Sequence, residues 1–283
     1  MHNPALQPAM TAAIDLDTYF QRIGYAGART PTLDTLRAIQ LRHTETIAFE
    51  NLNSVMRWPV RLDRESLQQK LVRDGRGGYC YEQNLLFGHV LKALGYQVTG
   101  LAARVLWNEP DAAITPRSHM LLSVELNEEP YIADVGFGIL TPTAPLRLEP
   151  DIEQATPHEP FHLIRAGQEF VMQAKIRGDW KTLYRFDLQE QLEPDYEVSN
   201  WYISTHPDSI FVTGLMAARP AKDCRYALRN NELTVHHLDG GTERHVLTNI
   251  AEMRETLESA FRLTLPDDPE LDSALARLTA PAG

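Results

Sequence analysis

One cysteine lies in a sequence context that favours nucleophilic chemistry. Residues 76–82 read RGGYCYE, and Cys80 stands where a helix with one apolar face is expected to begin. The N–H groups and the dipole of a helix N-terminus stabilise a thiolate, and the preceding pair of glycines lets a substrate approach the backbone closely. The alternative interpretation is a buried cysteine that packs as a small apolar side chain.

A thiolate nucleophile needs a base, and the base needs a group that orients it. His119 begins an apolar strand and Asp134 ends the next one, with the turn residues NEEP at 127–130 between them. In an antiparallel hairpin the two residues fall at the same end, so the carboxylate can hold one imidazole nitrogen and leave the other for the thiol. The alternative interpretation makes His119 a core histidine and Asp134 a turn cap, although an aspartate among apolar residues needs a buried partner.

The other candidate motifs are weaker. No pair of histidines has metal-ligand spacing, neither HExxH nor CxxC occurs, and two cysteines (Cys80 and Cys224) are too few for a cysteine-based zinc site. We therefore expect no metal. The glycine-rich stretch 73–78 does not match a phosphate-binding loop. Glu50 is expected to pair with an arginine, Arg76 being the candidate.

The elements that must position these residues follow from hydrophobic periodicity. The first third reads as helices capped by Asp15, Thr32 and Asp63, followed by a helix from Cys80 that Gly95 ends. Short apolar or alternating runs between 97 and 186 predict an antiparallel barrel or sandwich. The last third is mixed, and its predicted elements are a hairpin around 239–241, a helix with apolar residues from 250 to 261 and a terminal helix from 268.

Composition excludes several classes of protein. The 283 residues are 43% hydrophobic and 23% charged, which is ordinary globular usage. The net charge of −11 argues against nucleic-acid and membrane-surface partners, so a phosphorylated ligand would need a local cationic or N–H site. No apolar run approaches about 18 residues, and residues 1–14 lack the features of a signal peptide. We therefore expect a cytoplasmic chain whose cysteines are thiols.

Taken together, the motifs resemble those of the arylamine N-acetyltransferases, and they extend over nearly the whole chain. Residues 47–52 (IAFENL) and 76–82 (RGGYCYE) are similar to the family's I-P-F-E-N-L and R-G-G-Y-C-F-E. Further similar stretches are 118–122 (SHMLL), 134–138 (DVGFG), 184–186 (YRF) and 200–207 (NWYISTHP). The departures, Ala48 for proline and Tyr81 for phenylalanine, do not touch the candidate catalytic residues.

The resemblance implies a Cys-His-Asp triad of Cys80, His119 and Asp134 in an α+β fold with a core like that of cysteine proteases and transglutaminases. The implied domains are a helical bundle carrying the cysteine (1–95), an antiparallel β-barrel carrying the histidine and aspartate (96–200), and a C-terminal α/β lid (201–283).

The activity implied by the resemblance is transfer of an acetyl group from acetyl-CoA to arylamines, arylhydrazines or N-hydroxyarylamines, as in xenobiotic metabolism. It proceeds by a ping-pong mechanism through acetyl-Cys80. Acetyl-CoA is then a co-substrate, and no cofactor is bound permanently. Gly136 and Phe137 are the expected substrate-binding residues, and the Cys80 N–H is a candidate oxyanion donor.

Three other functions remain compatible with the residues. The first is an amide synthase-type relative that uses another acyl thioester. The second is a Cys-His-Asp hydrolase or transglutaminase-like enzyme. The third is a binding module without activity, against which an intact triad argues.

Overall fold

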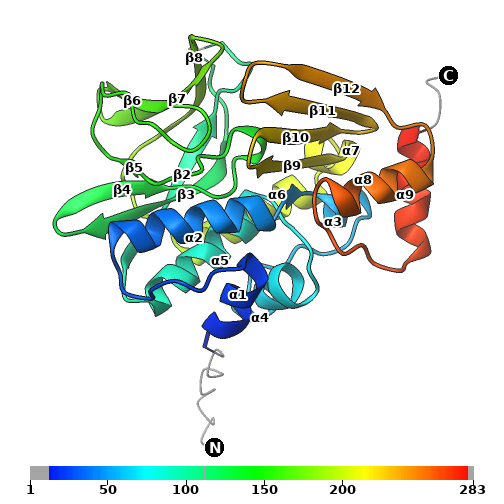
Figure 1. Cartoon of the computed structure of the whole chain (residues 1–283), viewed down its shortest axis with the longest axis horizontal. Helices are drawn as coiled ribbons and strands as arrows, with labels where there is room; N and C mark the ends of the chain where they lie inside the picture. The colour runs from blue at the N-terminus through cyan, green and yellow to red at the C-terminus, as the bar shows by residue number, and fades with distance from the viewer. Residues whose placement is uncertain (1–12, 111–112, 280–283) are drawn as a thin grey trace, which may run out of the picture.

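The computed structural model describes residues 13–110 and 113–279. Residues 1–12 and 280–283 lie outside the described residues. The first of these segments is the one for which the sequence predicts no signal peptide, and the second is the end of the predicted lid. The described chain is an α+β fold with a helical bundle, an antiparallel barrel and a C-terminal α/β lid. Figure 1 shows the barrel and the sheet of the lid beside one another, with most of the N-terminal helices below them.

The N-terminal helices begin at the capping residues that the sequence predicts. Side chains of Asp15, Thr32 and Asp63 accept hydrogen bonds from backbone N–H groups three residues later. The helices are α1 (Leu16–Ile23), α2 (Leu33–Thr46), α3 (Leu52–Val55), α4 (Arg64–Leu67), the π-helical η1 (Gln68–Arg73) and α5 (Cys80–Ala93). Gly95, just beyond α5, has the positive φ of +93° expected of a glycine that ends a helix.

The barrel is a seven-stranded antiparallel sheet in the order β5-β4-β3-β2-β8-β7-β6. Bridges from Pro150 to Leu163 and from Gln154 to Phe161 bring the two edges together, so the sheet is nearly closed. Buried apolar side chains that include Leu101, Leu121 and Phe186 form its interior. The strands are β2 (Gln97–Val105), β3 (Arg117–Leu126), β4 (Glu129–Ala133), β5 (Leu146–Arg147), β6 (Phe161–Ala166), β7 (Glu169–Ile176) and β8 (Asp179–Phe186).

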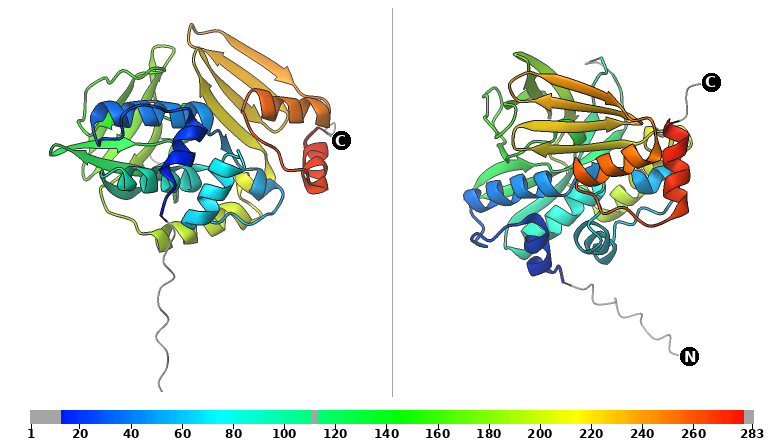
Figure 2. Two further views of the ribbon diagram at one scale, coloured as in Figure 1. Left: turned by 60° about the horizontal axis from the view of Figure 1, so that its bottom comes forward. Right: turned by 45° about the vertical axis from the view of Figure 1, so that its right-hand side comes forward.

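A second sheet, the lid sheet, has the order β1-β9-β10-β11-β12. Its strands are β1 (Phe49–Glu50), β9 (Met216–Ala221), β10 (Cys224–Arg229), β11 (Glu232–His237) and β12 (Thr242–Val246). The hairpin predicted around 239–241 is confirmed as β11–β12. Two helices, α8 (Ile250–Ser259) and α9 (Pro269–Thr279), lie at the end of the lid sheet away from the barrel (Figure 2).

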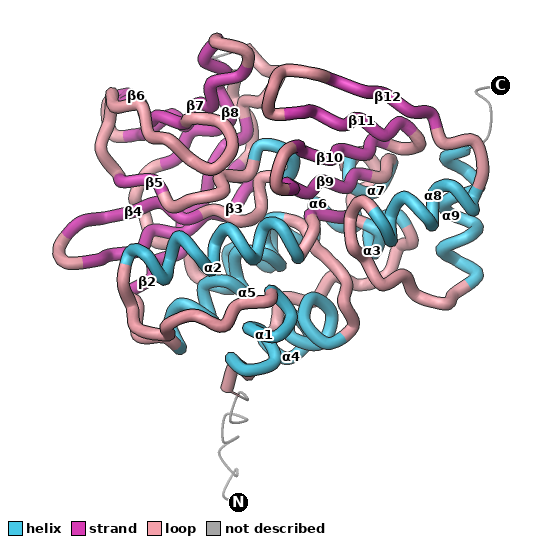
Figure 3. Tube along the Cα trace, in the orientation of Figure 1, coloured by secondary structure: helices cyan, strands magenta, loops and turns pink. Residues whose placement is uncertain are grey.

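Several elements differ from the sequence-based expectation. The helix predicted through Phe261 ends at Ser259, although Phe261 is fully buried. The sequence did not predict β9, β10 or α6 (Glu193–Thr205). Figure 3 shows α6 among the helices of the molecule. Its apolar residues Val198, Trp201 and Tyr202 are exposed, so it lacks the apolar stripe by which an amphipathic helix is recognised.

The N-terminal part of the chain is joined to the lid by both hydrogen bonds and packing. β1 pairs with β9 through Phe49–Ala218 and Glu50–Ala217. One apolar core contains Ala48, Leu52 and Val55 together with residues of the lid sheet, α8 and α9. The predicted bundle and lid therefore share a sheet and a core. Within residues 13–110 and 113–279, no helix is both long and apolar enough to cross a bilayer.

Candidate active site

Cys80 is the first residue of α5, and its side chain is almost entirely buried. Its Sγ lies 3.7 Å from the carbonyl oxygen of Ser118, so the start of α5 contacts the start of β3. Gly136 packs directly on Cys80, since a Cβ on Gly136 would lie 2.7 Å from the Cys80 Cα. Only glycine permits this close approach, so Gly136 supports the cysteine's backbone in addition to the substrate-binding role predicted from the sequence.

His119 and Asp134 lie at the same end of the β3–β4 hairpin, as the sequence pattern predicts. The register pairs Leu122 with Ala133, which places His119 and Asp134 just beyond this pair. His119 Nε2 and Asp134 Oδ2 are 2.7 Å apart, and both side chains are buried. Because Nε2 faces Asp134, Nδ1 is the ring nitrogen left for the Cys80 side chain.

The three side chains perturb one another's protonation. Burial acts to lower the pKa of His119, but the Asp134 charge and the hydrogen bonds with Asp134 and Cys80 outweigh it and raise this pKa to about 10. Burial acts to raise the pKa of Asp134, and the charge of His119 together with several hydrogen bonds lowers it instead. The arrangement therefore favours an imidazolium between an ionised carboxylate and the thiol.

Two further side chains hold the carboxylate of Asp134. Asn84 Nδ2 donates to Oδ1 at 3.1 Å and to the Met120 carbonyl at 2.8 Å, and the Tyr184 hydroxyl donates to Oδ2 at 3.0 Å. Sequence reasoning assigned neither residue a role. Asn84 could have been found, because it lies four residues after Cys80 and therefore on the same helix face. Tyr184 is on β8, 50 residues from Asp134, and gave no local signal beyond the family resemblance.

Phe137 packs against this cluster. Its ring centroid lies 5.0 Å from that of His119 and 4.9 Å from that of Tyr184, both in edge-on arrangements. The Phe137 N–H donates to the Thr141 hydroxyl at 3.0 Å. This hydrogen bond joins the two residues that flank the short helix η2 (Gly138–Leu140). Phe137 is only half-buried, and its side chain forms an aromatic wall beside His119.

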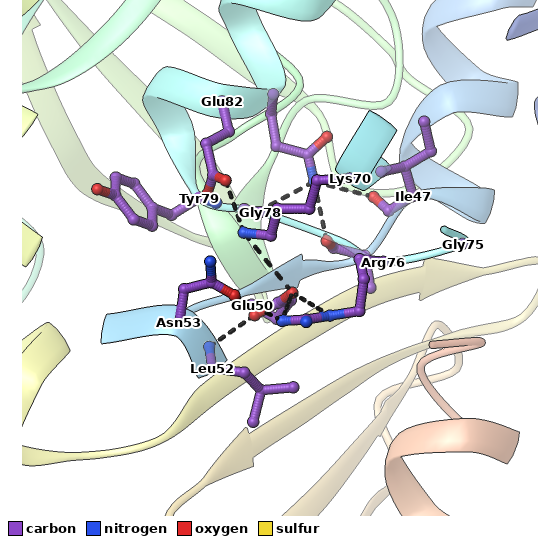
Figure 4. A network of polar contacts seen from close by, with 12 residues as sticks. Ile47, Glu50, Leu52, Asn53, Lys70, Gly75, Arg76, Gly78, Tyr79 and Glu82 are labelled. Atoms are coloured by element: carbon purple, nitrogen blue, oxygen red, sulfur yellow. Dashed lines mark hydrogen bonds and ion pairs between the residues drawn. The ribbon is translucent and has the colours of Figure 1, made fainter. Parts of the chain in front are cut away.

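A buried network of charges supports the loop before Cys80 (Figure 4). Arg76 Nη2 lies 2.9 Å from Glu50 Oε1, which confirms the predicted pair, and Lys70 Nζ lies 2.6 Å from Glu82 Oε1. Glu82 also accepts the Tyr79 N–H at 3.1 Å and so caps α5. Burial acts to raise the pKa of Glu50, but Arg76 and Lys70 outweigh it and the pKa is lowered. For Glu82, burial dominates and the pKa is raised.

The glycine pair also serves the chain's own packing. A Cβ on Gly77 would lie 2.1 Å from the Ala48 carbonyl oxygen, a distance that no other residue could accommodate without a backbone shift. Gln83, on α5, donates to the carbonyls of Ile47, Ala48 and Gly78 at 2.8–3.1 Å. The loop before Cys80 is therefore held against residues 47–48, and the position of Cys80 depends on both Gly77 and Gln83.

The described residues bring together a candidate nucleophile and a candidate general base, and they hold no cluster of metal ligands. Across 13–110 and 113–279, no three His, Cys, Asp or Glu side chains are placed to hold a metal ion. Cys80, His119 and Asp134 come from α5, β3 and the end of β4, and they meet where the helical bundle contacts the barrel. A thiol beside an imidazole that a carboxylate orients can attack an acyl carbon and shuttle one proton.

The chain is similar to known proteins in both sequence and structure. A family model described as N-acetyltransferase matches residues 32–269. The chain is 45% identical over 276 residues to the arylamine N-acetyltransferase of Mycobacterium tuberculosis, covering 94% of this chain and 97% of that one. It is 41% identical to the Escherichia coli enzyme of the same name, covering 89% and 90%. The structure of Mycobacterium marinum arylamine N-acetyltransferase in complex with CoA superposes with a TM-score of 0.90 at 44% identity, covering 93% and 99%. The chain therefore belongs to the arylamine N-acetyltransferase family.

Proposed function

We propose that the protein transfers the acetyl group of acetyl-CoA to arylamines, arylhydrazines or N-hydroxyarylamines through an acetyl-Cys80 intermediate. The observation that carries the proposal is the buried His119, which bonds Asp134 through one ring nitrogen and interacts with Cys80. In this proposal Cys80, His119 and Asp134 are the catalytic residues. The relative bound to CoA and the names of the other relatives support the choice of substrates.

In the first half-reaction, the Cys80 thiolate attacks the carbonyl carbon of the acetyl thioester. The bond between this carbon and the CoA sulfur breaks, and the His119 imidazolium gives its proton to the departing CoA thiolate. The products are free CoA, acetyl-Cys80 and a neutral imidazole. The Cys80 N–H, at the first position of α5, has no intrahelical partner and is the proposed donor to the oxyanion.

In the second half-reaction, the nitrogen of the arylamine attacks the acetyl carbon of acetyl-Cys80. Neutral His119 accepts a proton from this nitrogen, and the Cys80 sulfur leaves as a thiolate. The thiolate–imidazolium pair is restored, and the amide product departs. Asp134 keeps the imidazole in one tautomer and stabilises its protonated form throughout, because its own pKa is lowered and it stays ionised.

A cavity of about 460 Å³ between the barrel and the lid supports recognition of a phosphorylated co-substrate. Residues Ile139 and Leu140, which closely follow Phe137, form part of its wall, and Trp107, Lys175, Arg177 and His236 form other parts. The lining carries Lys175, Arg177 and Arg225 beside the carboxylates Glu159 and Asp239, and in a chain of net charge −11 we propose Lys175 and Arg177 as the local cations for a phosphate group. We propose that the cavity receives part of acetyl-CoA, and that the Phe137 ring and the Gly136 backbone face the amine.

Transient kinetics test the proposal. Acetyl-CoA alone should release about one CoA per Cys80 and then nearly stop, because covalent catalysis stores the acetyl group. Mass spectrometry should locate this group on the peptide that contains Cys80. An arylamine should then discharge it as the acetylated amine, and initial rates at several amine concentrations should give parallel double-reciprocal lines.

Other mechanisms give different results. A hydrolase would continue to release CoA without an amine. An amide synthase-type enzyme would leave acetyl-CoA intact and require another acyl thioester. Direct transfer between bound substrates would give intersecting lines and no acetylated protein. Each of these results contradicts the proposed acetyl-Cys80 route.

A further inference from the structure

Arg225 is the largest fully buried side chain that the structure describes, and it belongs to the lid. It lies on β10, at the position that pairs with Pro220 of β9 and His236 of β11. Its guanidinium contacts Glu159, with Nη2 2.6 Å from Oε2 and Nε 2.8 Å from the same oxygen. A buried charge needs such a partner, and in return Arg225 holds the pKa of Glu159 below its usual range against the effect of burial.

The rest of the guanidinium fork is directed to the loop beside the candidate active site. Nη1 donates to the Ile139 carbonyl at 2.8 Å, and Nη2 donates to the Thr141 carbonyl at 3.2 Å. The planar fork binds both carbonyls at once, which a lysine ammonium on a flexible stem cannot reproduce. One lid side chain therefore fixes both sides of Leu140, in the segment that directly follows Phe137.

Thr141 carries this restraint to the aromatic wall. Its hydroxyl accepts the Phe137 N–H at 3.0 Å and lies 3.4 Å from the Asp134 carbonyl. Phe137 in turn packs edge-on against His119 and Tyr184. Hydrogen bonds therefore connect Arg225 to Thr141 and Thr141 to Phe137, and ring contacts connect Phe137 to His119 and Tyr184.

We infer that Arg225 is a positioning residue that sets the acceptor specificity of the enzyme by holding segment 137–141, and with it the Phe137 ring. The inference rests on the proposed function, since it assigns Phe137 to the acceptor side of the site. It adds that the lid determines which amines fit, through a residue that lines the cavity proposed for acetyl-CoA and reaches the acceptor side only through segment 137–141.

Arg219 offers a matched control. It is also a buried arginine of the lid sheet, one strand away on β9, and it also binds backbone carbonyls. Its hydrogen bonds go to the carbonyls of Ala260, Glu45 and Pro220, at 2.6–3.3 Å, and thus away from segment 137–141. We therefore expect a replacement of Arg219 to perturb the lid without releasing the Phe137 segment.

The test compares kcat/KM for two acceptors, aniline and the bulkier 4-aminobiphenyl, in Arg225→Lys, Arg225→Met/Glu159→Gln and Arg219→Lys. In a ping-pong reaction, kcat/KM for the acceptor reports only the second half-reaction, so an effect on acetyl-CoA binding does not enter the ratio. The double variant removes both charges and avoids an unpaired carboxylate if the single change impairs folding. The CoA burst and the thermal unfolding midpoint are measured for every variant.

We expect both Arg225 variants to change the 4-aminobiphenyl to aniline ratio by about tenfold, the scale on which an altered apolar pocket discriminates substrates. Arg219→Lys should leave the ratio at the wild-type value. An unchanged ratio in the Arg225 variants overturns the inference, and so does an equal change in Arg219→Lys. If the wild-type protein forms no acetyl-Cys80, the proposed function itself fails, and the burst shows this separately from the ratio.

Discussion

At the residue scale, the proposed mechanism depends on the proton that His119 holds. Its Nε2 bonds an aspartate that is itself bound by Asn84, by Tyr184 and by the Gly136 N–H. Every one of these contacts favours the ionised carboxylate, and the carboxylate favours the imidazolium. The result is a cysteine beside a positive charge, which is the environment in which cysteines react as thiolates.

The two cysteines should therefore differ in reactivity, although both are buried. With limiting iodoacetamide at about pH 6, Cys80 should be alkylated well before Cys224, because Cys80 lies at a helix N-terminus beside the His119 imidazolium and Cys224 lies in a strand. Peptide mass spectrometry measures the two yields, and activity should fall in proportion to Cys80 labelling. Equal labelling of both cysteines would contradict the thiolate–imidazolium pair.

Asp134→Asn should fold and lose most turnover. The amide has nearly the same volume, but it can present its NH₂ group to His119 and favour the wrong tautomer, a change that costs about 10⁴-fold in the serine-protease triad. Thermal unfolding checks the fold, and the steady-state rate with an arylamine gives the loss. Near-normal turnover in the folded variant would make Asp134 a structural residue only.

Tyr184→Phe removes one hydrogen bond to the Asp134 carboxylate and nothing else of comparable size. A hydrogen bond to a charged group contributes about 1.5–3 kcal/mol, so we expect kcat/KM to fall by about 10- to 100-fold. Tyr96→Phe is the control, because the Tyr96 hydroxyl bonds the Thr32 carbonyl at 2.8 Å, outside the active-site cluster. Equal effects of the two changes would show that Tyr184 supports only the packing of the barrel.

At the element scale, the start of α5 is held by charges from three segments. Glu50 comes from β1, Lys70 from η1 and Arg76 from the loop that precedes α5, and the Glu50 carboxylate also accepts the Leu52 N–H at 2.6 Å. Such a network contributes to stability only while every charge keeps its partner. The position of Cys80 therefore depends on segments that start 30 residues before it.

Arg76→Met should destabilise the protein by about 3–5 kcal/mol, because it leaves the Glu50 carboxylate buried without its closest charged partner. Arg73→Met is the matched control: Arg73 pairs with Glu65 on the surface, where an ion pair contributes about 0–1 kcal/mol. Urea unfolding of the two variants measures the difference in free energy. A loss of less than 1 kcal/mol for Arg76→Met would show that Glu50 finds another partner.

At the scale of the whole molecule, the buried ionisable groups predict a maximum of stability near pH 6–7. Burial lowers the pKa of His43 to about 4, and the pKa values of Glu50 and Asp134 are also lowered. In acid the unfolded chain binds more protons at these groups, so stability is lost as the pH falls from about 6.5 toward 4. The contribution of His119 to stability changes with pH in the opposite direction. It is complete below pH 6.5 and is lost as the pH rises toward the His119 pKa of about 10.

The thermal unfolding midpoint, measured from pH 4.5 to 9.5, should therefore decrease on both sides of the maximum. His119→Gln should remove much of the alkaline decrease and leave the acid decrease in place, because His43 and Glu50 are unchanged. An alkaline decrease of the same size in this variant would mean that His119 does not hold its proton in the folded protein.

Much of the local structure could be predicted from the sequence. The caps at Asp15, Thr32 and Asp63, the helix start at Cys80 and the turn between β3 and β4 all depend on residues within a few positions of one another. Alternation along the two strands then placed His119 and Asp134 at one end of a hairpin. Local hydrogen bonds and hydrophobic periodicity are sufficient for such predictions.

Contacts between distant segments were decided only by the tertiary structure. Tyr184 reaches Asp134 across 50 residues, Arg225 reaches Ile139 across 86, and β1 joins a sheet whose other strands lie beyond residue 215. Hydrophobic periodicity does not identify these partners. Whether two distant side chains meet depends on how the bundle, barrel and lid pack together, and not on the spacing of residues within one helix or strand. The sequence by itself determined which residues can do the chemistry, and the packing of barrel, bundle and lid decided which other residues hold them in place.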